Sequence, residues 1–494
     1  MTRVLELPPE LAQFLKREPP QSLLIRGPPG TGKTSMAVSL FNNFPSNKAF
    51  VTSRVSRSEL IQEFPGLAHD PASHIVESAM ALDSLRETAR VLGHLRELLT
   101  APEKELDSRG LWLPDPLREA FSLVGGSKPG LIVIDSWDAL VERYVGTPGA
   151  SQEWLPDRAE LERLLLEQMG RGPLFVIMVS EHSEPAQLDY LVNGVVEMGW
   201  LGLIGREERW LFLRKLRGIR VDTRAYPFTL DGGKFQCIQP MPNVFQSRLQ
   251  TPDPDPDASA QDLWPGSRDF ADAFGRLPIG GITLLESGPS VPNEAIRQVY
   301  APIVSQVLHA GGRVIHVLPP SVRATDVLRS FRYLLSDERF TAQVRIQPIT
   351  ASPEVPENLR SIILPVPRRE PDESGTRFPE GVRFFEGAPT GVCNLLVAWM
   401  SGLIPFEPDP RTDPTPGMLQ VVIGGITHRV PVHIVFVAPA GSHFAELVRP
   451  IASIHIRVTG ESGRVFLSGE QPVTPSFALT EQADRKGFRL LPIV

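Results

Sequence analysis

A glycine-rich loop between an apolar run and a helical pattern constrains the fold of this chain more than any other feature. The apolar run is Ser22–Arg26, the loop Gly27–Thr34 reads GPPGTGKT, and a helical pattern follows over Lys33–Asn43. A buried strand that turns tightly into a helix is the repeating unit of a parallel sheet covered by helices. The first half of the chain is therefore predicted to be an α/β domain.

The loop also satisfies the phosphate-binding pattern GxxxxGK[ST] in full. Its glycines let successive backbone N–H groups curl around phosphates, Lys33 reaches the β and γ oxygens, and the Thr34 hydroxyl ligates magnesium. The alternative, a turn without a ligand, needs neither Lys33 nor Thr34. We therefore predict a site for ATP with Mg²⁺. Its binding residues are Gly27, Pro28, Pro29, Gly30, Thr31, Gly32, Lys33, Thr34 and Ser35.

Asp135 closes a second apolar run, Leu131–Ile134. Ligands of open parallel sheets bind outside the carboxyl ends of the strands, where this carboxylate is expected to lie. There Asp135 can hold the magnesium ion through water, together with Thr34. The alternative is an Asp that only caps the following helix.

The same alternation of short apolar runs and helical patterns continues through the first half. Strands are predicted at Lys48–Thr52, Gly130–Ile134, Leu174–Val179, Gly194–Met198 and Arg209–Leu213, and helices at Ala79–Leu99 and Asp157–Gly170.

Length requires more than one core, because single cores stop growing at roughly 250 to 300 residues and this chain has 494. The clearest break is the Pro-Asp alternation Thr251–Asp257, which neither helix nor sheet tolerates. We predict a nucleotide-binding domain over residues 1–241, an extended linker over 242–262, and a second domain over 263–494.

The second half echoes the first, since Thr283–Pro289 can be laid without gaps on Ser22–Pro28. Later strands are predicted at Gly312–Leu318, Asn394–Ala398, Val432–Ala438 and Arg464–Leu467. A distant internal duplication is favoured over a chance likeness of two α/β domains. The expected architecture is two tandem parallel-sheet domains.

The nucleotide machinery is missing from the second half. In the ungapped register, Glu294 takes the place of Lys33 and Ala295 that of Thr34, and a carboxylate there would repel phosphate. The later strand continues into Trp399 without a metal-binding carboxylate. The second domain is predicted to be degenerate and to serve as a packing partner or a surface for another protein.

A basic stretch follows the predicted strands of the first half. In Leu213–Gly218 (LRKLRG), strand alternation places Lys215 and Arg217 on one face, where two cations suit the γ-phosphate held by a neighbouring subunit. A solvated, charged strand pair is the ordinary alternative. The basic residues are Arg206, Arg209, Arg214, Lys215, Arg217, Arg220 and Arg224.

The order of these segments resembles the KaiC-like branch of the RecA-superfamily ATPases over Ser22 to Phe235. The motifs that carry the resemblance are the loop, Leu131–Leu140 (LIVIDSWDAL), Val179–Glu181, Tyr190–Glu197, Leu213–Gly218 and Tyr226–Phe228. Within that branch the sequence is most similar to the GvpD family of archaeal gas vesicle regulatory proteins, through Val51–Val55, Val179–Glu181 and its arginine-rich segment. The resemblance implies ATP binding, subunit assembly and regulatory work.

One departure from that branch concerns catalysis. Related ATPases carry paired glutamates after the second strand to polarise the attacking water, whereas this chain has Ser53, Arg54, Val55 and Ser56 there. Glu181 follows the strand Leu174–Val179 and is a candidate base or water-orienting group, with a surface carboxylate as the alternative. Weak ATPase activity or tight binding with little turnover is expected.

Composition narrows the partners. A net charge of -7 and a pI near 5.9 give no overall attraction to nucleic acid or anionic lipid. No apolar run approaches a membrane span, and the two cysteines suggest no disulfide framework, so a cytoplasmic protein is expected. The leading hypothesis is an ATP-dependent regulator that forms a homo-oligomer or acts on a protein partner. A RecA-like DNA recombination or repair ATPase remains the alternative, because of the basic stretch.

Overall fold

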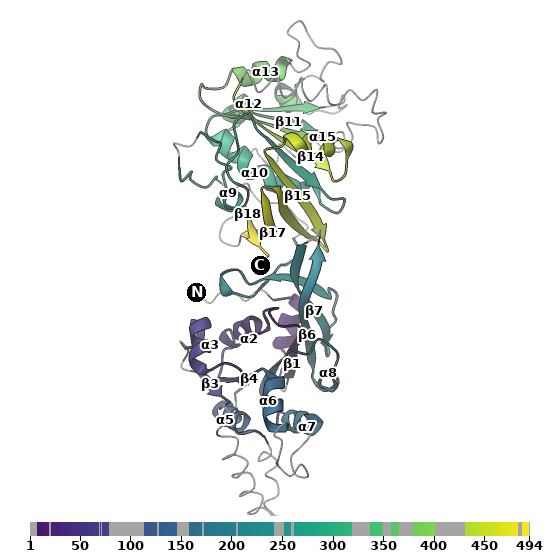
Figure 1. Ribbon diagram of the computed structural model, residues 1–494. Helices are drawn as coiled ribbons and strands as arrows, with labels where there is room; N and C mark the ends of the chain where they lie inside the picture. Colours follow the sequence, from purple (N-terminus) through teal and green to yellow (C-terminus); the bar gives the residue numbers. More distant parts are fainter. Residues whose placement is uncertain are drawn as a thin grey trace, which may run out of the picture. The chain divides into compact units, whose positions relative to one another are not determined.

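The computed structural model divides into two compact units, an N-terminal unit (Met1–Gln239 with Ile493–Val494) and a C-terminal unit (Pro240–Pro492; Figure 1). It describes residues 7–18, 21–68, 70, 72–78, 113–125, 128–145, 158–169, 172–203, 206–241, 251–257, 261–318, 336–348, 357–364, 379–400, 430–482 and 487–493. The predicted helix Ala79–Leu99 lies outside the described residues.

The N-terminal unit is built on one nine-stranded sheet in the order β3-β2-β4-β5-β1-β6-β7-β8-β9. From β3 to β6 the neighbouring strands are parallel, and from β6 to β9 they are antiparallel. The strands are β1 Gln21–Arg26, β2 Lys48–Thr52, β3 Ser73–Glu77, β4 Gly130–Asp135, β5 Leu174–Ser180, β6 Gly194–Leu203, β7 Arg206–Leu216, β8 Ala225–Thr229 and β9 Gln236–Cys237.

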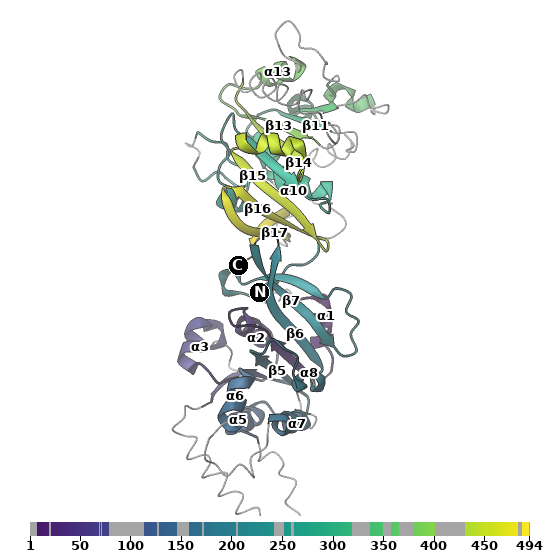
Figure 2. The same cartoon turned by 45° about the vertical axis from the view of Figure 1, so that its right-hand side comes forward.

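Each face of this sheet has its own apolar core, because successive strand residues point to opposite faces. Leu23 and Ile25 pack with helix α2, whereas Leu24 packs with α5, α6 and α7. In Figure 2 these three helices gather at one side, apart from α2. The helices are α1 Pro9–Leu15, α2 Lys33–Asn42, α3 Arg57–Glu63, α5 Asp115–Val124, α6 Trp137–Val145, α7 Arg158–Met169 and α8 Gln187–Leu191, with 3-10 turns Pro65–Ala68 and Asp231–Gly233.

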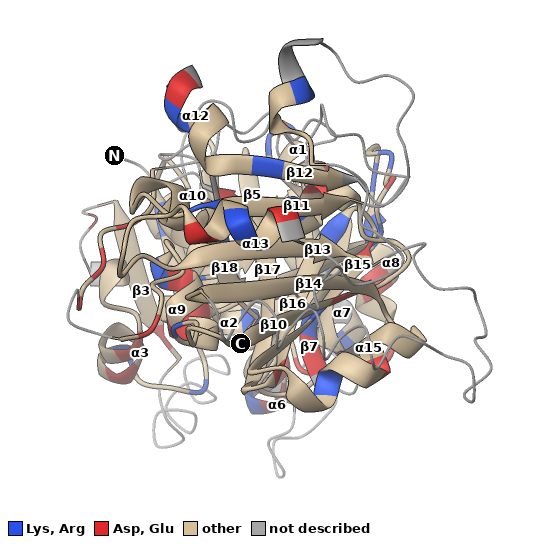
Figure 3. Cartoon of the chain, turned by 90° about the horizontal axis from the view of Figure 1, so that it is seen from above, with Lys and Arg blue, Asp and Glu red and all other residues tan. Residues whose placement is uncertain are grey.

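The C-terminal unit repeats this topology strand for strand, in the order β12-β11-β13-β14-β10-β15-β16-β17-β18. The prediction of two tandem α/β domains is confirmed. Its inner strands β11, β13 and β14 carry no Lys, Arg, Asp or Glu, as Figure 3 illustrates. The strands are β10 Ile282–Ser287, β11 Val314–Leu318, β12 Val344–Pro348, β13 Asn394–Trp399, β14 Val432–Pro439, β15 Ile454–Glu461, β16 Arg464–Gln471, β17 Val473–Gln482 and β18 Gly487–Pro492.

The helices of the C-terminal unit also follow the N-terminal arrangement, since the long helix α10 comes directly after β10, as α2 comes after β1. Its described helices are α9 Arg268–Phe274, α10 Asn293–His309, α12 Asp337–Gln343, α13 Pro379–Glu386 and α15 His443–Val448, with 3-10 turns Glu357–Ile362 and Arg449–Ile451.

The two units can be aligned by asking which face of the sheet each strand residue points to. Leu24 faces the core away from α2, and in the same way Leu284 faces the core away from α10, whereas Leu285 packs with α10. Pairing to the next strand agrees, because Leu23 is the first residue of β1 to pair with β6 and Thr283 the first of β10 to pair with β15. Thr283 therefore corresponds to Leu23.

This register corrects the expected match of the two loops. Asn293, the first residue of α10, corresponds to Lys33, and Glu294 corresponds to Thr34. The expectation that Glu294 and Ala295 stand on Lys33 and Thr34 is wrong by one residue, because the ungapped alignment ignored the alternation of strand side chains. A phosphate-binding lysine is absent at the corrected position as well.

The Pro-Asp segment predicted as a linker makes specific contacts inside the C-terminal unit. Both carboxylate oxygens of Asp255 accept hydrogen bonds from the Arg276 guanidinium at 2.7 Å. The carbonyl oxygen of Asp253 accepts the indole N–H of Trp264 at 2.9 Å, and its carboxylate accepts the backbone N–H of Arg268 at 3.0 Å. Prolines exclude regular structure here, and side-chain pairs attach the segment instead.

Candidate functional site

The glycine-rich loop follows β1 and leads into α2 at the carboxyl edge of the sheet. Gly27 has φ +147°, and a Cβ atom there would lie 2.0 Å from the carbonyl oxygen of Met198 on β6. Gly32 is left-handed, with φ +92°, immediately before the first helical residue. Only glycine meets both demands without strain, so the loop conformation depends on the residue type at these positions.

Lys33 lies at the amino end of α2 with its ammonium group turned into the loop. Its Nζ donates hydrogen bonds to the carbonyl oxygens of Gly27 and Pro28, both at 2.8 Å. Burial lowers the pKa of Lys33, and the negative charges of Glu181 and Asp135 oppose that shift. The Lys33 amine therefore lies where phosphate oxygens would compete with the two carbonyl oxygens for its hydrogen bonds.

Thr34 and Asp135 come together although they are far apart in the sequence. The Thr34 hydroxyl donates to Asp135 Oδ2 at 2.8 Å. Asp135 is the last residue of β4, which the sheet order separates from β1 by β5 alone. Burial raises the pKa of the Asp135 carboxyl, opposed by the Thr34 hydrogen bond and by the charge of Lys33.

A hydroxyl beside a carboxylate fits Mg²⁺, which binds through one or two protein oxygens plus phosphate and water. Among the described residues no cluster of three or more His, Cys, Asp or Glu side chains could hold a metal ion by itself. The donors present therefore suit an ion that arrives with a phosphate ligand. A dedicated protein cage for a metal is not found in the described part of the chain.

Glu181 follows β5 and forms an ion pair with Arg54, which follows β2. The charges of both residues act on Lys33 and on Asp135. Glu181 therefore lies near Lys33 and Asp135. The partner Arg54 was missed as a functional residue, although it lies in the segment that lacks the expected glutamates.

Asp138 is a buried carboxylate that holds the Glu181 segment. Its Oδ2 accepts hydrogen bonds from the Ser180 hydroxyl and from the Glu181 backbone N–H, both at 2.8 Å. Its Oδ1 accepts one from Arg158 at 2.9 Å. Burial opposes ionisation of Asp138, but these three hydrogen bonds outweigh it and lower its pKa. Sequence reasoning missed Asp138; its signal was a second acid three residues after Asp135.

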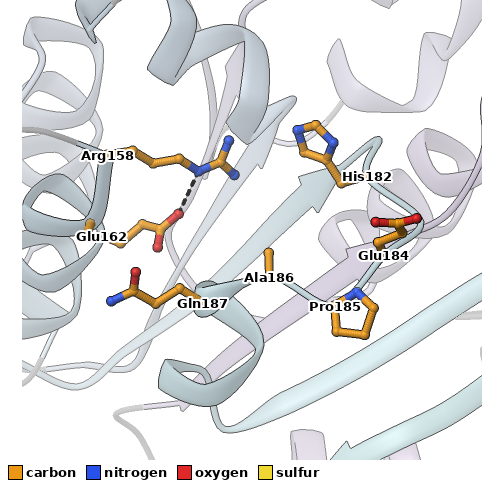
Figure 4. Close-up of a pocket in the computed structure, with 8 residues that line it drawn as sticks. Arg158, Glu162, His182, Glu184, Pro185, Ala186 and Gln187 are labelled. Atoms are coloured by element: carbon orange, nitrogen blue, oxygen red, sulfur yellow. Dashed lines mark hydrogen bonds and ion pairs between the residues drawn. The ribbon is translucent and has the colours of Figure 1, made fainter.

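A pocket of about 570 Å³ opens beside this carboxylate, between α7, α8 and the end of β5 (Figure 4). Arg158 donates to Glu162 at 3.0 Å, and the His182 ring approaches Asp138 at 3.4 Å. The pocket therefore adjoins the network that supports Glu181. Its lining residues are Arg158, Ala159, Glu162, His182, Glu184, Pro185, Ala186 and Gln187.

Arg209 is the member of the basic stretch that contacts the loop of its own unit. Its Nη1 donates to the carbonyl oxygen of Gly30 at 2.6 Å. The guanidinium lies 4.3 Å from the ring centre of Trp200, its cross-strand partner on β6. Strand β6 continues past its predicted end to Leu203, and β7 begins before its predicted start, at Arg206. These extensions bring Trp200 and Arg209 to the edge of the sheet where the glycine-rich loop lies.

Lys215 and Arg217 lie together, but at the other end of β7. Lys215 Nζ donates to the carbonyl oxygens of Asp189 and Tyr190 at 2.8 and 3.1 Å, and Arg217 donates to the same Tyr190 oxygen at 3.4 Å. Lys215 pairs with Val195, near the amino end of β6. Among the described residues, neither cation has a hydrogen bond to the loop of its own unit, and both cover the end of α8.

Comparison with known proteins relates the residues of this site to a protein family. The model of the GvpD gas vesicle protein P-loop domain matches residues 11–218. The resemblance to GvpD predicted from the sequence is confirmed, and the matched residues include the loop, Asp135, Glu181 and the Lys215–Arg217 pair.

Relatives extend the GvpD likeness beyond this domain. Protein GvpD1 of Halobacterium salinarum is 23% identical over 96% of this chain and 94% of the relative. Protein GvpD2 of the same organism is 26% identical over 66% of this chain and 64% of its own length. A proteasome-activating nucleotidase of Thermococcus onnurineus is 33% identical over 42% of this chain and 54% of the relative. The chain is thus a GvpD-like P-loop protein with a second, structurally similar unit.

A search of the described helices found none with the length and apolarity that membrane crossing requires.

One nucleotide per chain is the expected binding stoichiometry. At the positions of Lys33, Thr34 and Asp135 the C-terminal unit has Asn293, Glu294 and Trp399, and Glu294 is already paired with Arg297 at 2.9 Å. Calorimetric titration of the full chain with Mg-ATP should give one site. A second site of micromolar affinity that survives Lys33→Ala would contradict a nucleotide-free C-terminal unit.

Proposed function

We propose that this chain is an ATP-binding regulatory protein of the GvpD type, which uses bound ATP to control its own assembly or its affinity for a protein partner in the cytoplasm. The observation that carries the proposal is the convergence of Lys33, Thr34 and Asp135 at the carboxyl edge of the first sheet. The names of the relatives and of the matching family point to gas vesicle proteins as the setting of this regulation.

Each of these side chains has a proposed role in ATP binding. The backbone of Gly27–Thr34 would wrap the phosphates, and Lys33 would exchange its two carbonyl acceptors for β and γ oxygens. Thr34 and Asp135 would hold Mg²⁺, which when bound neutralises charge between the β- and γ-phosphates. The hydrogen bonds of Lys33 to the loop and of Thr34 to Asp135 keep the three side chains at this edge of the sheet.

Turnover is expected to be slow or conditional. Glu181 would orient an attacking water, but it forms an ion pair with Arg54. A carboxylate paired with a guanidinium is a poorer proton acceptor than a free one. Hydrolysis would therefore be slow unless Arg54 leaves Glu181, which makes turnover conditional.

Glu181→Gln should lower the rate of ATP hydrolysis at least about 10-fold and should not weaken ATP affinity, because losing an interaction made only in the transition state lowers turnover without weakening ground-state binding. The measurement is steady-state phosphate release together with calorimetry. Glu184→Gln, in the same polar turn, is the matched control and should behave as the parent. Equal rates in Glu181→Gln and the parent would assign Glu181 a surface role only.

A DNA-acting ATPase is the second candidate, and the basic stretch is the feature that favours it. The described members are largely engaged within the unit: Arg209 with Gly30, Arg214 with Glu197 at 2.8 Å, and Arg220 with Asp222 at 2.7 Å. Engaged cations are less available to phosphates of a nucleic acid. Titration with ATP followed by measurement of assembly, with and without DNA, separates the two functions. ATP-dependent assembly without DNA supports the regulator.

A further inference from the structure

Arg54 stands at the edge of the sheet where the nucleotide is proposed to bind. The strand before it, β2, pairs with β4 so that Thr52 lies beside Asp135. The next residue, Ser53, donates its backbone N–H to the Asp135 carbonyl oxygen at 2.9 Å. Arg54 therefore leaves the sheet directly beside the proposed magnesium ligand.

The guanidinium of Arg54 is accessible and loosely held. Its side chain is 46% exposed, and the side chain of its partner Glu181 is 30% exposed. An ion pair in contact with water contributes little to stability. If Arg54 leaves Glu181 and pairs with a stronger anion, the fold therefore loses very little stability.

Four charged residues lie near one another at the carboxyl edge of the sheet, each after or at the end of a different strand. Lys33 follows β1, Arg54 follows β2, Asp135 ends β4 and Glu181 follows β5. The positive charge of Arg54 acts on Lys33 and Asp135, as does the negative charge of Glu181. Asp138 accepts the backbone N–H of Glu181 at 2.8 Å and anchors that residue, whereas the Arg54 side chain is the more exposed partner of the pair.

We propose that Arg54 binds the γ-phosphate of ATP and leaves Glu181 to do so. This inference rests on the proposed ATP site at Lys33. The γ-phosphate carries more negative charge than one carboxylate, and the planar guanidinium matches two phosphate oxygens at once. ADP lacks this group and leaves the Arg54–Glu181 pair closed. Arg54 thus distinguishes ATP from ADP, and its departure frees Glu181 to orient water.

The first test compares the affinities of the full chain for ADP and for a non-hydrolysable ATP analogue with magnesium. Arg54→Ala should lower the preference for the ATP analogue over ADP about 10-fold, the effect of one lost charge-assisted contact, while ADP affinity stays within about threefold. Arg54→Lys keeps the charge and should retain part of the preference. Arg57→Ala removes an exposed arginine from the next helix and should leave both affinities unchanged.

The second test uses Glu181→Gln in two backgrounds. If Glu181 competes with the γ-phosphate for Arg54, Glu181→Gln should raise affinity for the ATP analogue in the parent and should have no such effect in Arg54→Ala. Equal effects in both backgrounds would overturn the exchange. Thermal melts of each variant verify that the fold is retained.

An unchanged preference for ATP over ADP in folded Arg54→Ala and Arg54→Lys would overturn the role of Arg54 while leaving the Lys33 site intact. Failure of the parent chain to bind either nucleotide would instead overturn the proposed function, and with it this inference.

Discussion

Replacing Lys33 with alanine is expected to reduce ATP affinity on the order of 100-fold, since a hydrogen bond to a charged group contributes about 1.5 to 3 kcal/mol and each 1.4 kcal/mol is tenfold in affinity. Lys33 is 7% exposed, and its ammonium group points into the loop that would hold the phosphates. ADP affinity should fall as well, because Lys33 also serves the β-phosphate. Isothermal titration calorimetry with Mg-ATP and Mg-ADP measures both.

The fold should survive this change, because the apolar core beneath α2 is formed by Met36, Ala37 and Phe41 and not by Lys33. Lys16→Ala is a suitable control, as it removes an exposed lysine from the end of α1. Its affinity should equal that of the parent. Parental ATP affinity in folded Lys33→Ala would overturn the assignment of the loop as a nucleotide site.

Replacing both Lys215 and Arg217 with alanine is expected to remove ATP-dependent assembly and to lower any turnover by about 10³-fold or more, the effect of a cation supplied across a subunit boundary. Both cations lie at the end of β7 remote from the loop of their own unit. A neighbouring subunit is therefore the natural source of their phosphate. ATP affinity of the dilute chain should remain within about threefold. Light scattering and phosphate release are the measurements.

A control for this pair must remove two charges from the same stretch without touching α8. Arg220→Ala with Arg224→Ala does so, because Arg220 is an exposed residue paired with Asp222. Assembly should persist in this control. If the Lys215 and Arg217 variant instead assembles normally with ATP and loses DNA binding, the basic stretch is a nucleic-acid contact and the regulatory switch is wrong.

A buried charge cluster shows how far the two units have diverged on one topology. In the N-terminal unit Arg26 on β1 pairs with Asp189 at 2.6 Å and Glu197 at 2.8 Å. At the corresponding position of β10 stands Glu286, which accepts hydrogen bonds from His455 at 2.8 Å and Arg449 at 3.2 Å. The charges are reversed while the ion cluster remains, because a buried charge is tolerated only beside its partner.

Local pattern was sufficient for the elements that carry the loop. Strand β2 has the predicted bounds Lys48–Thr52, and α2 ends one residue before the predicted Asn43. Runs of buried residues and a glycine-rich turn are properties of neighbours in the chain, so periodicity can identify them. The position of Asp135 at the carboxyl end of its strand followed from the same logic.

Weaker local signals left elements undetected. Strand β3, Ser73–Glu77, has one fully buried residue among five, and the short strands β8 and β9 lie at the antiparallel edge. Such segments become strands because a neighbour offers hydrogen bonds, which a single-sequence pattern does not report.

Sequence alone predicted a phosphate-binding loop, a metal-binding aspartate at the end of a parallel strand and a second unit without that loop. Only the tertiary structure decided that Arg54 meets Glu181, that Asp138 holds the Glu181 backbone and that Arg209 touches Gly30. These contacts join residues that are far apart in the sequence. Arg54 follows β2 and Glu181 follows β5, and in the sheet only β4 lies between those two strands. Sheet order is set by how both cores pack, and no local spacing encodes it.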